Sequence, residues 1–105
     1  MPPTWRYIAK IVKTMIYIVN YDIKNAERKD AFLNEAKKIG DTSPYLPHAL
    51  FIDCPDANKN QNTIYSQLKQ SITDEDLVVV VRAPLASMSG WLTSSVVDWL
   101  KVHNK

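Results

Sequence analysis

Residues 15–22 read MIYIVNYD, and this stretch decides the fold of the chain. Its residues are mostly β-branched or aromatic, and its hydrophobicity is almost continuous up to Asp22. Such a run is typical of a strand that is buried in the middle of a sheet. We therefore expect a central strand over residues 15–21, followed directly by a carboxylate.

A helix is expected immediately after this strand, from Ala26 to about Ile39. Asn25 can accept a hydrogen bond from a backbone amide as the N-cap, and Glu27 places negative charge in the first turn. Gly40 stands in the position where helices commonly stop. The apolar stripe of this helix consists of Phe32, Leu33, Ala36 and Ile39.

The segments after this helix alternate between strand and helix patterns. Residues 41–48 contain two prolines and predict a loop or a proline-broken edge strand, which forms a loose hairpin with a short strand over residues 49–53. Residues 77–81 read LVVVV and predict another fully buried strand, and residues 91–103 predict a terminal helix. Between them, a second helix carries the apolar stripe Ile64, Tyr65, Leu68 and Ile72.

The resulting order is β-α-β-β-α-β plus a C-terminal helix, which predicts an α+β, ferredoxin-like fold with helices on one face of an antiparallel sheet. We expect one domain over residues 15–105, preceded by a short N-terminal extension over residues 1–14. The extension is either a basic amphipathic helix that lies on a membrane or a partner, or a frayed arm ahead of Met15.

The composition excludes several classes of protein. With 46% hydrophobic and 23% charged residues, the 105-residue chain is expected to fold rather than to be disordered. Its single cysteine excludes a disulfide framework and favours the reducing cytoplasm. No apolar run approaches the roughly 18 residues of a membrane span, and the N-terminus does not resemble a secretory signal.

Charge gives a weak indication of a partner. The net charge is +2, but residues 1–40 hold eight basic and four acidic residues, whereas residues 41–105 hold five basic and seven acidic residues. The basic N-terminal part could contact phosphate groups, or it could be an ordinary solvated surface.

A motif at the end of the first strand points to a family. Residues 20–23 read NYDI, Arg28 follows six residues after Asp22, and Gly40 ends the expected helix. This pattern resembles the CRISPR-associated protein 2 family, whose first strand typically ends in Tyr-Asp-Ile before an arginine-containing helix. The acidic turn and hydrophobic strand over residues 74–78 look similar as well. The terminal segment looks closer to the SinR-like group of related small ferredoxin-like proteins, and virulence-associated protein D is a third relative of this kind.

The resemblance implies a homodimer in which two copies of Asp22 face each other. In such a family the paired aspartates bind Mg²⁺ and support phosphodiester cleavage, so Asp22 is the candidate catalytic and metal-binding residue. The substrate would be RNA or DNA. Tyr21 would position it, Arg28 would contact a phosphate, and Lys24 and Lys29 would add to nucleic-acid binding.

Other interpretations remain open. Asp22 could simply complement the N-terminal amides of the following helix. The chain could instead be a non-catalytic dimerisation or adaptor module whose terminal helix, with Trp91 and Trp99, binds a protein partner. The segment with His48, Asp53 and Cys54 could indicate Cys/His chemistry, although a buried structural cysteine is the more common case.

Overall fold

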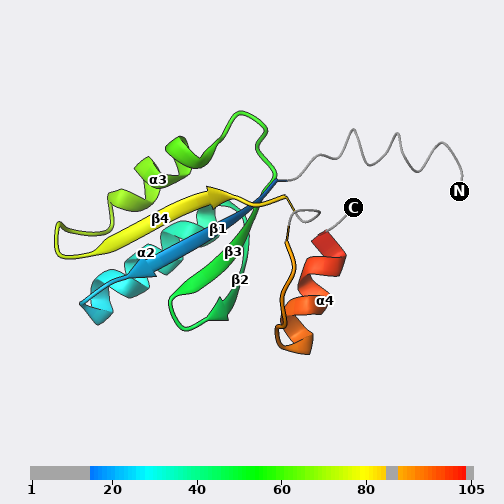
Figure 1. Ribbon diagram of the computed structural model, residues 1–105. Coiled ribbons are helices and arrows are strands. Elements are labelled where there is room, and N and C mark those ends of the chain that lie inside the picture. Colours follow the sequence, from blue (N-terminus) through cyan, green and yellow to red (C-terminus); the bar gives the residue numbers. More distant parts are fainter. Residues whose placement is uncertain (1–14, 85–87, 104–105) are drawn as a thin grey trace, which may run out of the picture.

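The computed structural model describes residues 15–84 and 88–103, which form a four-stranded antiparallel sheet and helices that pack on it (Figure 1). The sheet order is β2-β3-β1-β4. This is the ferredoxin-like arrangement with an added C-terminal helix, as the sequence predicts. The expected extension, residues 1–14, lies outside the described residues. The elements are β1 (Met15–Asp22), α2 (Ala26–Ile39), β2 (Asp41–Leu46), β3 (Ala49–Cys54), α3 (Gln61–Lys69), β4 (Leu77–Arg82) and α4 (Ser94–His103).

Strand β1 is the central strand that the sequence predicts. It pairs with β3 on one side and with β4 on the other, both antiparallel. Its side chains alternate between the two faces of the sheet, as in any strand. Tyr17, Val19 and Tyr21 are buried beneath the helices, whereas Ile16 and Ile18 belong to a second apolar cluster on the other face.

The ends of α2 match the sequence signals. The side chain of Asn25 accepts a hydrogen bond from the backbone N–H of Arg28 at 2.9 Å, which satisfies one otherwise unpaired amide of the first turn. At the other end, the backbone N–H of Gly40 donates to the carbonyl of Ala36. A Cβ atom at position 40 would collide with the backbone carbonyl of Asp53, so the close approach of the helix end to β3 requires glycine.

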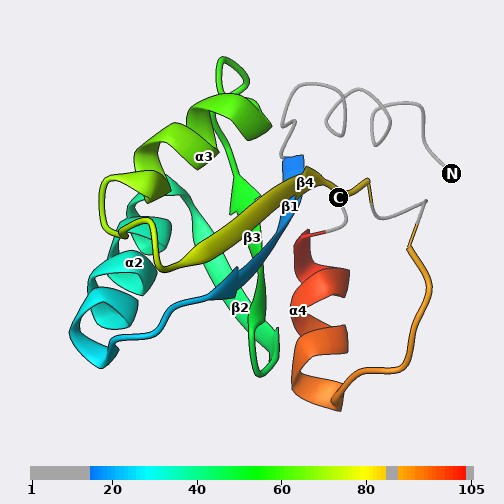
Figure 2. The same cartoon turned by 60° about the vertical axis from the view of Figure 1, so that its left-hand side comes forward.

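The two faces of the sheet are covered differently. Figure 2 shows α2 and α3 on one side of the sheet and α4 on the other. The face under α2 and α3, here called the closed face, carries the main core. The largest side chains of this core that are almost wholly buried are Tyr17, Phe32, Leu50, Ile52, Ile64 and Leu68.

The opposite face, here called the open face, is covered only in part. Helix α4 places Val96 against Ile16 and Phe51. Trp99 continues the contact by stacking on Phe51, with ring centroids 6.1 Å apart. Because α4 contacts β2 but has few contacts with β4, the described residues leave the β4 side of this face exposed.

The prediction that residues 77–81 form a fully buried strand is wrong. Strand β4 lies at the edge of the sheet, and its alternate side chains Leu77, Val79 and Val81 are 64%, 56% and 45% exposed on the open face. Val78 and Val80 pack on the closed core. Exposed strand positions are predicted from the alternation of apolar and polar residues, and an uninterrupted apolar run has no such alternation.

The terminal helix is shorter than the sequence predicts. It begins at Ser94 rather than at Trp91, and Trp91 is 98% exposed in the segment that precedes it. The two tryptophans therefore do not share a helix face. Among the described residues, no helix has the length and the apolar character that crossing a membrane requires.

Candidate functional site at the end of strand β1

Asp22 occupies the last position of β1, directly opposite Leu77 of β4. Because Tyr21 points into the closed core, the alternation of the strand places Asp22 on the open face. Its side chain is 45% exposed, and Oδ2 accepts a hydrogen bond from Lys24 Nζ at 2.7 Å. This hydrogen bond to Lys24 lowers the pKa of the Asp22 carboxyl below its usual value. Asp22 is therefore an ionised, solvent-accessible carboxylate.

A second carboxylate near the same end of the sheet has a different environment. Asp76 immediately precedes β4, and its side chain is fully buried. It accepts hydrogen bonds from Arg28 Nε at 2.9 Å and Nη2 at 3.1 Å, and from the backbone N–H of Lys24 at 2.9 Å. The Arg28 guanidinium holds the pKa of Asp76 well below its usual range.

Asp76 thus joins the start of α2 to the start of β4. The backbone N–H of Thr73 also donates to Asp76 at 3.0 Å, so both carboxylate oxygens are engaged by protein donors. A carboxylate that is occupied in this way has little capacity left for a metal ion. The structural role of Asp76 is to hold the turn that presents Asp22.

Three of the predicted nucleic-acid-binding residues, Lys24, Arg28 and Lys29, follow the end of β1 in the sequence. Lys24 is exposed beside Asp22, and Lys29 is half-buried next to Arg28 in the first turns of α2. The Arg28 side chain is bound to Asp76, with Glu75 at 3.8 Å, so its donors Nε and Nη2 are already in use. The structure thus places Asp22, Lys24 and Arg28 at one end of the sheet.

Tyr21 does not join this group. Its ring lies in the closed core, 5.2 Å from the ring of Phe32, and only 6% of the residue is exposed. Burial raises the pKa of its hydroxyl. Neighbouring residues of a strand point to opposite faces, so a tyrosine next to an open-face aspartate is directed into the helix-covered core.

The residues proposed for Cys/His chemistry are also separated. Cys54 is buried in the closed core, and Asp53 points to the open face, as strand alternation predicts. His48 is exposed at the other end of β3, with its ring edge-on to Tyr21. The geometry therefore provides no cysteine–histidine pair within β3 and its turn.

A metal ion has few ligands within one chain. Across residues 15–84 and 88–103, no group of three or more His, Cys, Asp or Glu side chains is arranged to hold a metal ion. Mg²⁺ needs oxygen ligands and usually takes one or two carboxylates with several waters. Among the described residues, Asp22 can supply one such carboxylate ligand.

A cluster that the sequence analysis missed lies at the far end of the open face. His103 of α4 contacts Asp53 through Nδ1 and Asp41 through Nε2, the latter at 2.8 Å. The indole Nε1 of Trp99 also donates to Asp41 Oδ2, at 3.2 Å. Asp41 and Asp53 are direct partners across the β2–β3 hairpin. Asp41 and Asp53 each lie six positions from residue 47, the middle of the hairpin. This equal spacing is the sequence signal that could have placed the two carboxylates opposite each other.

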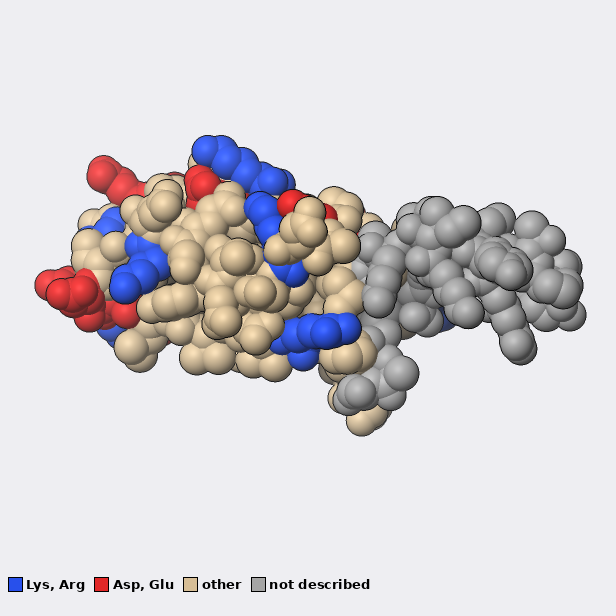
Figure 3. All heavy atoms as spheres, turned by 90° about the horizontal axis from the view of Figure 1, so that it is seen from above, with Lys and Arg blue, Asp and Glu red and all other residues tan. Residues whose placement is uncertain are grey.

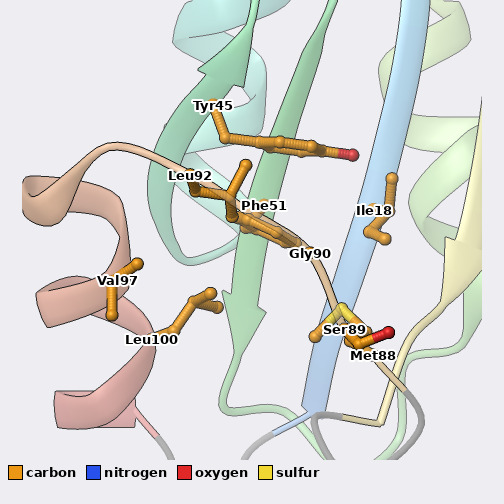
Figure 4. A pocket seen from close by; sticks show the side chains of 9 residues that line it. All are labelled: Ile18, Tyr45, Phe51, Met88, Ser89, Gly90, Leu92, Val97 and Leu100. Atoms are coloured by element: carbon orange, nitrogen blue, oxygen red, sulfur yellow. The ribbon is translucent and has the colours of Figure 1, made fainter.

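A cavity of about 610 Å³ separates the open face from α4 and the segment before it (Figure 4). Ile18, Tyr45 and Phe51 of the sheet form one wall. Figure 4 shows Val97 and Leu100 of α4 directed toward the cavity from the opposite side. The packing of α4 against the sheet is therefore looser than that of α2 and α3.

The surface charge does not single out a binding site, and the comparisons with known proteins do not identify a family. On the face seen in Figure 3, the Lys and Arg side chains lie in separate small groups with uncharged surface between them. No protein-family model matches the chain, and no curated protein matches it.

Proposed function

We propose that the protein is a homodimer that binds RNA or DNA and cleaves phosphodiester bonds with Mg²⁺ held between two copies of Asp22. The observation that carries this proposal is the position of Asp22. Its half-exposed carboxylate lies on the open face immediately beside the uncovered apolar side chains of β4.

The uncovered strand supports association with a second copy. Leu77, Val79 and Val81 form an exposed apolar row on an edge strand, and the backbone groups of its outer side are unpaired within the sheet. Proteins usually protect such edges with charges, prolines or short strands. Here the strand is six residues long and its one charged residue is Arg82 at its end, so coverage by another chain is the natural way to protect the row.

A partner on this row would also meet the aspartate. Leu77 lies opposite Asp22, and Val79 lies opposite Asn20, so a two-fold axis near these pairs would bring two Asp22 side chains toward each other. Two exposed carboxylates suit Mg²⁺, which would stabilise charge on the phosphate and orient an attacking water. Lys24 would then be available to contact a phosphate of the substrate.

The proposal is tested by cleavage of labelled single-stranded RNA and double-stranded DNA in the presence of Mg²⁺. We expect the wild-type protein to cleave one of them, Asp22→Asn to lose the activity, and chelation of Mg²⁺ to abolish it. Asp30→Asn, which changes an exposed carboxylate on α2, is the matched control and should retain full activity. Equal activity of wild type and Asp22→Asn would contradict a role for Asp22.

One observation favours a second candidate function, a non-catalytic adaptor. Trp91 is 98% exposed, and tryptophan is enriched among the residues that carry the binding energy of protein interfaces. Trp99, in contrast, packs on the chain's own sheet and is not available to a partner. Photo-crosslinking from position 91 distinguishes the functions, because an adaptor should give a defined heterologous adduct while showing no Mg²⁺-dependent cleavage.

A further inference from the structure

The strongest unassigned feature is the contact of His103 with two aspartates. Asp41 comes from β2 and Asp53 from β3, and the two face each other across the hairpin on the open face. Like charges directly opposite each other on neighbouring strands repel. The side chain of Asp53 is only 7% exposed, so its charge is poorly solvated and needs a partner.

His103 can donate to both carboxylates only in its protonated form. Its two ring nitrogens contact different carboxylates, Nδ1 with Asp53 and Nε2 with Asp41. A neutral imidazole carries only one N–H. Its other nitrogen would then direct a lone pair toward a carboxylate oxygen, and no hydrogen bond could form between these two acceptors. An imidazolium donates to both carboxylates and also neutralises part of their charge. Because the two carboxylates meet opposite sides of the ring, the three residues do not converge on one metal position.

The same cluster fixes the end of α4. His103 lies in the last turn of the helix, and Trp99, one turn earlier, stacks against its ring at 4.2 Å and donates to Asp41. The remaining contacts of α4 with the sheet are apolar and border the cavity described above. Among the described residues, the charged groups in contact with His103 are Asp41 of β2 and Asp53 of β3.

We propose that His103 is a proton-dependent clasp that holds α4 on the open face. When His103 is protonated, α4 is docked and covers Phe51 and Ile16. When His103 loses its proton, the two aspartates repel each other and α4 is released, which exposes apolar surface next to β4. Histidine is the side chain type whose ordinary charge change lies between about pH 5 and pH 8.

The test measures the accessibility of Trp99 by acrylamide quenching of its fluorescence. The chain has three tryptophans, so the Trp5→Phe/Trp91→Phe variant reports on Trp99 alone. We expect weak quenching at about pH 5.5 and quenching close to that of an exposed indole at about pH 8.5. The Trp5→Phe/Trp99→Phe variant retains Trp91, which is exposed, and should be quenched strongly and equally at both pH values.

Three substitutions in the Trp99-only background complete the experiment. His103→Gln removes the charge and should give strong quenching at both pH values, whereas His103→Arg keeps the charge and should give weak quenching at both. His48→Gln, which changes the other histidine of the chain, should leave the pH response intact. Far-UV circular dichroism checks that each variant retains the sheet and the helices α2 and α3. Equal quenching of the parent at both pH values, or a pH response that survives in His103→Gln, would overturn the proposal.

Discussion

The two faces of the sheet show two ways of covering the same strands. On the closed face, α2 and α3 bury aromatic and aliphatic side chains of β1 and β3 almost completely, around a continuous core. On the open face, α4 covers β2 and β3 over a cavity, and the row on β4 stays exposed. The difference indicates that the closed face maintains the fold, whereas the open face leaves apolar side chains of β4 exposed.

The two phenylalanines of the chain allow a direct comparison of the faces, and the largest effect is expected here. Phe32 is 0% exposed in the closed core, and Phe51 is 3% exposed beneath α4. We expect Phe32→Ala to lower the free energy of unfolding by about 3–5 kcal/mol. Phe51→Ala should cost less than half as much, because α4 can undock locally without unfolding the sheet. Urea denaturation of both variants gives the answer, and equal losses would contradict the division into two faces.

The next largest effect is expected at Gly40. A methyl group at this position would collide with the carbonyl of Asp53, so Gly40→Ala forces either the end of α2 or β3 to shift. We expect a loss of about 1–3 kcal/mol, as for other overpacked sites. Gly90→Ala is the matched control, because a Cβ there meets no atom within 4 Å. A neutral Gly40→Ala would show that α2 approaches β3 less closely.

Asp76 should make stability depend on pH. Its pKa is lowered in the folded state by Arg28, so its contribution is present above the pKa of the unfolded chain and is lost as pH falls. Stability should therefore decrease below about pH 4. Asp76→Asn should be less stable than wild type at neutral pH and should decrease less steeply in acid. Thermal unfolding across this pH range measures both effects, and exposed Asp74→Asn should behave like wild type.

The smallest effect on stability is expected on β4. Val79 is 56% exposed, so Val79→Lys should change the free energy of unfolding by less than about 0.5 kcal/mol. The same substitution should disrupt association, because it places a charge in the apolar row. A large loss of stability in the isolated chain would show that Val79 is buried by the chain itself.

The sequence predicted the closed face better than the open face. Asn25, Gly40 and the apolar stripe of α2 are local signals, and they predicted the bounds of that helix correctly. The burial of β4 could not be predicted, because an all-apolar strand looks the same at an edge as in the centre. Trp91 was assigned to a helix that begins only at Ser94.

The site residues also divide into those that a local sequence pattern indicates and those that depend on contacts between distant segments. Asp22 became a candidate through the resemblance carried by residues 20–23, a local pattern, whereas the binding of Arg28 by Asp76 depends on a contact across 48 positions. The contacts of His103 with Asp41 and Asp53 likewise join distant segments. Local patterns do not contain such pairings, which arise only when the sheet order and the position of α4 are known.

The most direct test of the account is the mass of the protein in solution, measured by sedimentation equilibrium for wild type and Val79→Lys. We predict that the wild type has about twice the 12.0 kDa mass of one chain and that Val79→Lys has the mass of a single chain. A wild type that remains monomeric at concentrations well above those of the cleavage assay would contradict the account, because a single chain supplies only one Asp22. A dimer that persists in Val79→Lys would place the interface away from β4 and separate it from Asp22.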